Sequence, residues 1–116
     1  MGYRQALPQT IGLTCITDGG METVLTFQRG IDLPCFAAFP LLESDTGTSE
    51  LLSYFEPYAL IALERGIGLV LDTPTWRANA DWGRRLDYDA ERLADANRKA
   101  VRLIEQIGRA SCRERV

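Results

Sequence analysis

Two short apolar runs in the chain each end in acidic and hydroxyl residues. The run over residues 11–17 is followed by Asp18-Gly19-Gly20, and the run over residues 67–71 is followed by Asp72-Thr73-Pro74-Thr75. Continuous apolar runs of this length are typical of parallel strands that are buried on both faces. We therefore predict two strands whose polar ends lie together at the carboxyl edge of a parallel sheet, where α/β folds keep their binding sites.

Helical spacing of apolar positions predicts a short and a long helix between these strands. Residues 21–28 favour one or two helical turns. The longer helix is expected to take Thr48 or Ser49 as its N-cap and to end at Gly66. Pro57 lies inside it, so the helix is expected either to kink or to restart with this proline in its first turn.

A last helix is predicted to follow Asp89, which can cap its first turn. Residues 31–47 and 73–88 read as irregular loops. The apolar stripe of this helix comprises Leu93, Asn97, Ala100, Val101 and Ile104, with Asn97 expected to bond a loop carbonyl. The order strand, helix, strand, helix favours an α/β fold built from a parallel βαβ unit and a further helix.

Composition narrows the class of protein. The chain of 116 residues carries 13 basic and 16 acidic side chains, a net charge of −3, and no basic stripe in its first hundred positions. Nucleic acid is therefore not an expected partner. No apolar run approaches the roughly 20 residues that span a bilayer, and the N-terminus lacks the apolar core of a signal peptide. We expect a cytoplasmic protein without a membrane partner.

The chain contains three cysteines and no histidine. An odd number of cysteines at irregular spacing favours reduced thiols over a disulfide framework, and Cys15 and Cys35 are expected to be small buried apolar residues. The absence of histidine removes Ser-His and Cys-His nucleophile pairs, and HExxH zinc sites, from this chain.

Three segments in register resemble the homocysteine S-methyltransferase family. They are Thr17-Asp18-Gly19-Gly20-Met21-Glu22-Thr23, Ala62-Leu63-Glu64-Arg65-Gly66 and Asp72-Thr73-Pro74-Thr75, and the resemblance covers roughly residues 13–106. The family is a (β/α)8 TIM barrel in which zinc, held by three cysteine thiolates, activates the thiol of homocysteine. A small donor then methylates that thiol to give methionine.

The resemblance implies both a fold and a set of substrate-binding residues. A closed barrel needs about 250 residues, so residues 1–106 would be the N-terminal βαβα portion of a truncated TIM barrel. By position, Asp18, Gly19 and Gly20 would hold the amino-acid portion of homocysteine. Asp72, Thr73 and Thr75 would shape the adjoining wall, where the family often has Glu in place of Asp72.

The resemblance also implies that the zinc site lies outside this chain. In the family the zinc cysteines lie in motifs near the sixth and eighth strands, and neither Cys15 nor Cys35 corresponds to a ligand. We therefore assign no catalytic residue and no metal ligand here. This polypeptide alone is expected to bind no zinc and to be inactive, with homocysteine and a methyl donor as the small-molecule substrates of the full-length enzyme.

The last ten residues, 107–116, have a different character. They break the apolar stripe of the last helix, place three arginines beside a cysteine, and read as the translation of a common sequencing-library adapter. We expect a non-native tail, so that the natural chain is cut within the last helix. The alternative is a basic, solvated tail.

Several alternatives remain open from the residues alone. Asp18 and Asp72 could serve acid/base chemistry in another TIM-barrel enzyme, or the chain could be a small non-catalytic α/β binding module. The Asp18-Gly19-Gly20 segment could be a plain turn in which the carboxylate caps nearby amides. In the second loop, Trp76 and Trp82 could either wall a ligand cavity or anchor the loop on the core. The arginines of this loop could either meet an anionic substrate group or form a solvated face (Arg77, Arg84, Arg85).

Overall fold

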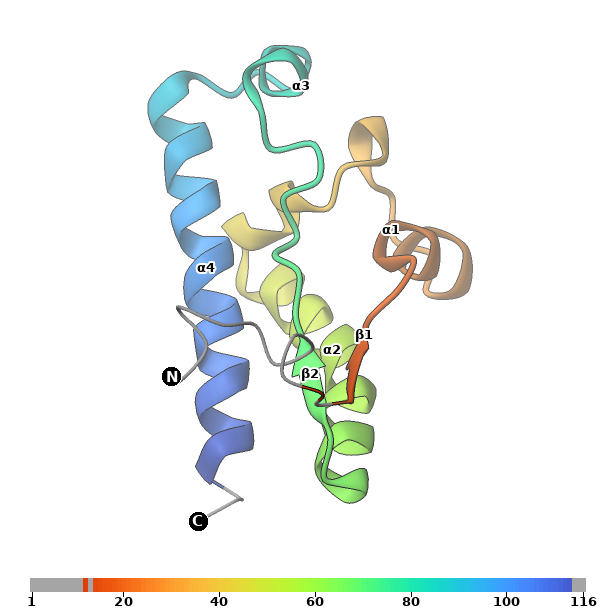
Figure 1. Ribbon diagram of the computed structural model, residues 1–116. Helices are drawn as coiled ribbons and strands as arrows, with labels where there is room; N and C mark the ends of the chain where they lie inside the picture. The colour runs from red at the N-terminus through yellow and green to blue at the C-terminus, as the bar shows by residue number, and fades with distance from the viewer. Residues whose placement is uncertain (1–11, 13, 114–116) are drawn as a thin grey trace.

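A computed structural model of the chain describes residues 12 and 14–113, with side chains up to residue 109. It shows a mixed α/β chain that is mostly helical and contains one pair of short parallel strands, β1 (Cys15–Thr17) and β2 (Gly68–Val70) (Figure 1). The predicted parallel pairing is confirmed. Both strands are shorter than their apolar runs, and residues 11 and 13 of the first run lie outside the described part.

The register of the strands depends on a small residue in β2. Cys15 lies opposite Gly68, and Thr17 lies opposite Val70. A Cβ atom added to Gly68 would lie 2.7 Å from the Sγ atom of Cys15. Glycine therefore leaves the space that the cysteine side chain occupies between the two strands.

The long helix α2 (Asp45–Arg65) begins earlier than predicted. Its N-cap is Ser44, whose Oγ accepts a hydrogen bond of 2.9 Å from the backbone N–H of Gly47, so the prediction of Thr48 or Ser49 is wrong. The glycine at position 47 makes this first turn read as a loop in the sequence. Only glycine fits at this position, because a Cβ atom would collide with the carbonyl of Leu41. The helix ends as predicted at Gly66, in a left-handed conformation (φ 64°).

Pro57 neither breaks nor restarts α2, which runs through it as one helix. Because proline has no N–H, the carbonyl of Ser53, four residues earlier, loses its intrahelical donor. Arg29 supplies a replacement, since its Nη2 lies 3.4 Å from the Ser53 oxygen while its Nη1 donates to the carbonyl of Glu50 at 3.3 Å. A side chain from a distant segment thus satisfies the carbonyl that Pro57 leaves free.

The segments predicted as irregular contain short helical turns. After β1 comes α1 (Met21–Thr23), which continues into a π-helical turn η2 (Val24–Gln28). Two 3₁₀ turns then precede α2, namely η3 (Pro34–Phe36) and η4 (Phe39–Glu43). The second predicted loop contains α3 (Ala80–Arg85), which is capped by the side chain of Asn79.

The last helix, α4 (Ala90–Arg113), begins as predicted after Asp89, whose Oδ1 accepts a 2.7 Å hydrogen bond from the N–H of Arg92. Asn97 donates to the loop carbonyl of Ala78 at 3.4 Å, as expected. Val101 is 52% exposed, so its place in the predicted stripe is wrong. The buried stripe comprises Ala96, Ala100, Leu103 and Ile107.

The buried position of Ile107 also bears on the predicted change of character at this residue. Ile107, the first residue of the segment 107–116, is still buried in the stripe, and α4 continues to Arg113. The side chains beyond residue 109 lie outside the described part, so the expected break in the stripe stays a prediction. The repeat of apolar positions at three and four residues simply includes one more turn. The origin of residues 107–116 stays a prediction.

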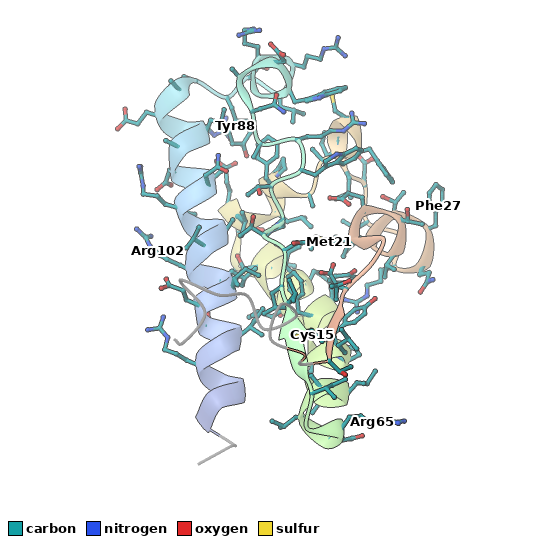
Figure 2. The ribbon with its side chains drawn as sticks, in the orientation of Figure 1. Cys15, Met21, Phe27, Arg65, Tyr88 and Arg102 are labelled. Atoms are coloured by element: carbon teal, nitrogen blue, oxygen red, sulfur yellow. The ribbon has the colours of Figure 1, made fainter. Side chains whose placement is uncertain are left out.

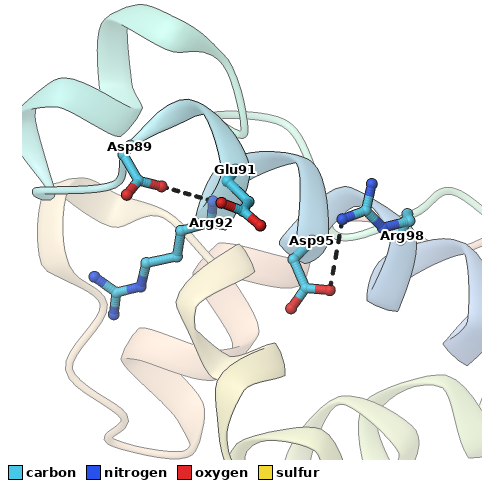
Figure 3. A pocket seen from close by; sticks show the side chains of 5 residues that line it. All are labelled: Asp89, Glu91, Arg92, Asp95 and Arg98. Atoms are coloured by element: carbon cyan, nitrogen blue, oxygen red, sulfur yellow. Dashed lines mark hydrogen bonds and ion pairs between the residues drawn. The ribbon is translucent and has the colours of Figure 1, made fainter.

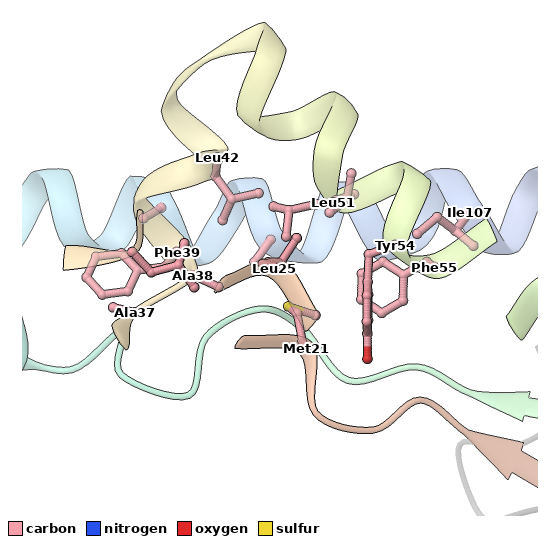
Figure 4. Close-up of a cluster of buried hydrophobic side chains, with 14 of the residues drawn as sticks. Met21, Leu25, Ala37, Ala38, Phe39, Leu42, Leu51, Tyr54, Phe55 and Ile107 are labelled. Atoms are coloured by element: carbon pink, nitrogen blue, oxygen red, sulfur yellow. The ribbon is translucent and has the colours of Figure 1, made fainter. Parts of the chain in front are cut away.

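The hydrophobic core lies where α2, η4 and α4 meet, with α1 and η2 contributing from the side of the strands (Figure 4). α2 contacts both the strand pair and α4 (Figure 1). Its fully buried side chains are Leu51 and Phe55, and Phe39 of η4 packs edge-on against Tyr88 with ring centroids 5.0 Å apart. Among the described helices, none is long and apolar enough to cross a membrane.

A charged contact fastens η4 to α4. Arg92 meets Glu43 with two hydrogen bonds, Nε to Oε2 and Nη2 to Oε1, both at 2.7 Å. The guanidinium also lies over the ring of Tyr88, 4.0 Å from its centroid. The hydrogen bonds from Arg92 hold the pKa of Glu43 below its usual value.

Candidate functional site

The carboxylate of Asp18, directly after β1, is held by a tyrosine from α2. The hydroxyl of Tyr54 lies 2.9 Å from Oδ2 of Asp18 and 2.9 Å from the carbonyl oxygen of Gly19. The side chain of Tyr54 is only 2% exposed. In sequence, Tyr54 lies 36 positions after Asp18. Burial raises the pKa of Tyr54, and the neighbouring Tyr58 and Asp18 raise it further, so the hydroxyl keeps its proton at neutral pH and donates a hydrogen bond.

The second oxygen of Asp18 accepts no hydrogen bond from the residues that the structure describes. Its Oδ1 is buried and makes no hydrogen bond to any described group, and the N-terminus of α1 has no side-chain cap. A turn stabilised by capping of nearby amides, the alternative left open from the residues, is therefore not what the structure shows. A buried acceptor without a partner is uncommon in folded proteins and calls for a physical reason.

The two glycines beside Asp18 are both exposed, and Gly19 is bordered by open space. Gly20 has a left-handed backbone (φ 65°), which favours glycine there, whereas a Cβ at Gly19 would meet nothing within 4 Å. Packing therefore does not require glycine at position 19. The open surface beside this backbone is where a ligand can approach Asp18.

The polar end of β2 forms a second group. Asp72 is exposed, while Thr73 and Thr75 are half-buried and their hydroxyls lie 2.7 Å apart. The N–H of Thr75 donates to the carbonyl of Thr73 at 2.8 Å, which closes a tight turn around the buried Pro74. This turn is anchored by its proline, and the threonine hydroxyls bond each other.

The strand register relates the two groups. Thr17 and Val70 are paired neighbours in a parallel sheet, so Asp18 and the segment from Asp72 to Thr75 follow the same edge. The structure thus brings the predicted site residues to one end of the strand pair. Within the described part, no hydrogen bond joins Asp18 to the segment after β2, so the two groups are neighbours rather than one bonded network.

The arginine and tryptophan residues of the second loop differ in their surroundings. Trp76 is 61% exposed and does not anchor the loop on the core. The guanidinium of Arg77 stacks on both indoles, 4.3 Å from the ring centroid of Trp76 and 3.9 Å from that of Trp82, and donates to the carbonyl of Cys35 at 3.0 Å. Arg77 therefore bridges two loops and is not part of a solvated face, whereas Arg84 and Arg85 are exposed as expected.

The described cysteines are separated and differ in exposure. Cys15 is half-buried in the strand pair, where Figure 2 labels it, while Cys35 is exposed in η3 with a left-handed backbone (φ 53°), so the expected burial of Cys35 is wrong. In the described part of the chain, no three histidine, cysteine or acidic side chains gather to hold a metal ion. The described residues therefore do not fit a zinc centre.

A shallow pocket at the start of α4 is lined by charged residues (Figure 3). Its members are Asp89, Glu91, Arg92, Asp95 and Arg98. Most of these charges already have partners, because Asp89 caps the N–H of Arg92 and Asp95 lies 3.9 Å from Arg98. The pocket reads as a solvated helix surface rather than as a binding site.

Sequence reasoning missed Tyr54. A tyrosine on an apolar helix face reads as a core residue, and its hydroxyl partner is 36 positions away in sequence. The only local signal is that a buried tyrosine hydroxyl needs a hydrogen-bond partner.

Comparison of the chain with protein-family models, with curated proteins and with solved structures gave no match.

Proposed function

We propose that the chain is the N-terminal βαβα portion of a (β/α)8 barrel of the homocysteine S-methyltransferase type. Its role there is to bind the amino-acid portion of homocysteine. The supporting observation is the carboxylate of Asp18, held at the carboxyl end of β1 next to the polar end of β2. Carboxyl ends of parallel strands are where barrel enzymes bind their substrates.

Each site residue has a chemical task in this proposal. The carboxylate of Asp18 accepts a hydrogen bond from the ammonium group of homocysteine. The exposed backbone of Gly19 and Gly20 lets the substrate approach closely. Thr73 and Thr75 offer hydroxyls, and Asp72 a carboxylate, on the adjoining wall. Because the described residues do not fit zinc, no catalytic step is assigned to this chain, which is proposed to be inactive by itself.

The first test is the gene beyond the codon for Gln106. The proposal expects an open frame that continues through a full barrel and includes a late pair of neighbouring cysteines. A continuing frame without those cysteines would favour acid/base chemistry at Asp18 and Asp72. A natural stop codon would favour a small binding module.

The second test is a methyl-transfer assay on the complete gene product with homocysteine as acceptor. Asp18→Asn removes the negative charge that pairs with the ammonium group, so we expect the KM for homocysteine to rise about tenfold or more. Asp32→Asn is the matched control, since Asp32 is exposed and lies outside both polar groups. Equal KM values for the two variants, or a wild-type protein without methyl transfer to homocysteine, would contradict the proposal.

A further inference from the structure

We propose that Tyr54 is a positioning residue for Asp18: the tyrosine hydroxyl holds one carboxylate oxygen, Oδ2, and leaves the other, Oδ1, as the acceptor for the substrate's ammonium group. This inference rests on the proposed function and adds to it a residue from α2. Neither the strand ends nor the segments that resemble a family include this tyrosine.

The ring of Tyr54 is well placed to act as a rigid support. It is 2% exposed and packs against Phe55 and Tyr58, with ring centroids 5.2 Å and 5.5 Å away. In Figure 4 the ring extends from α2 toward the side of the strands, with its hydroxyl at the tip. A tyrosine has only two side-chain torsions, so a packed ring holds its hydroxyl in one place at little entropic cost.

The hydroxyl has one proton and two acceptors within 2.9 Å, the carboxylate of Asp18 and the carbonyl of Gly19. Hydrogen bonds to an ionised acceptor are roughly twice as strong as neutral ones, so the bond to Asp18 dominates. This bond fixes the side chain of Asp18, and the contact with Gly19 holds the start of the turn. Tyr54 therefore orients both the carboxylate and the glycine backbone beside it.

The other carboxylate oxygen of Asp18, Oδ1, is the atom that this arrangement leaves for the substrate. Oδ1 of Asp18 is buried and has no donor among the described groups. A carboxylate that served only to bind Tyr54 and support the turn would be expected to use both oxygens, since an unsatisfied buried acceptor lowers stability. An incoming ammonium group, which carries three donors, supplies what is missing.

The experiment measures kcat and KM for homocysteine in the complete gene product. Tyr54→Phe keeps the ring and removes only the hydroxyl, and we expect the KM to rise about tenfold with kcat changed less than about twofold. Tyr88→Phe is the matched control. It removes another buried hydroxyl, one whose charged neighbours are Glu43 and Arg92 rather than Asp18.

A double-mutant cycle with Asp18→Ala separates positioning from general stability. If Tyr54 acts mainly through Asp18, then most of the effect of Tyr54→Phe on KM disappears once the carboxylate is gone. If Tyr54 has only a structural role, Tyr54→Phe would lower the midpoint of thermal unfolding in both backgrounds and leave the KM unchanged. That result would overturn the inference. A wild-type enzyme that does not use homocysteine overturns the proposed function and this inference with it.

Discussion

The pairing of Cys15 with Gly68 can be tested through the space between them, because the register places both polar strand ends at one edge. Replacing Gly68 with alanine puts a methyl group 2.7 Å from the Sγ atom of Cys15. Overpacking of this kind costs about 1–3 kcal/mol. The backbone of Gly68 is not left-handed, so alanine also stabilises by about 0.4–1 kcal/mol through the unfolded chain. We expect Gly68→Ala to lower the free energy of unfolding by up to about 2.5 kcal/mol.

A double-mutant cycle combines Gly68→Ala with a second mutation, Cys15→Ala. This second mutation removes the Sγ atom that the new methyl group would meet. The closest remaining atoms are Cβ of residue 15, at 3.6 Å, and the carbonyl oxygen of Thr14, at 3.7 Å, both ordinary contacts. In this background Gly68→Ala is expected to be neutral or to stabilise by up to about 1 kcal/mol. The coupling energy between the two sites is therefore about 1–3 kcal/mol.

The assay is urea unfolding of the chain followed by circular dichroism for the wild type, both single variants and the double variant. Gly108→Ala is a control in open space within α4, where nothing lies within 4 Å, and it is expected to stabilise by up to about 1 kcal/mol. The same loss for Gly68→Ala in both backgrounds would mean that Cys15 does not face Gly68. The register, and the shared edge that depends on it, would then be refuted.

Two further predictions concern contacts that join distant segments. Arg29→Ala leaves the carbonyl of Ser53 without a donor, and we expect it to lower the free energy of unfolding in urea by about 1 kcal/mol. In a Pro57→Ala background the backbone N–H of residue 57 returns, so the loss should be much smaller there. An equal loss in both backgrounds would contradict this role of Arg29. The pKa of Glu43 is lowered in the folded chain by its hydrogen bonds with Arg92, so the stability it contributes is present above the ordinary pKa of 4.5 and is lost as pH falls through the lowered value. Glu43→Gln should therefore flatten the acid side of the curve of unfolding free energy against pH, and an unchanged curve would argue against the contact.

The parts of the fold that could be predicted are those with a local signature. Gly66 and Asp89 mark helix ends because a left-handed glycine and a capping carboxylate act within one turn. Ser44 is also a local capping residue, but the glycine at position 47 made the following turn read as a loop. Glycine is required at position 47 because of the backbone of Leu41, a contact that the local sequence pattern does not show.

The candidate site divides in the same way. Asp18 and the segment after β2 could be found because polar residues that end apolar runs are visible in the sequence. The partner of Asp18 could not, because the contact from Tyr54 depends on how α2 packs across the strand ends. For the same reason, the stacking of Arg77 between Trp76 and Trp82 had no signal in the sequence.

The turn after β1 and helix α2 are tied together twice, in opposite directions. Tyr54 reaches from α2 to Asp18, and Arg29, at the end of the helical turns that follow Asp18, reaches back to the Ser53 carbonyl that Pro57 leaves free. The two attachments fix the Asp18 turn with respect to α2, whereas the segment after β2 relies on Pro74 and on its own hydrogen bonds. Preorganisation is therefore greater on the β1 side, and a group that must be held in a fixed orientation is best bound there.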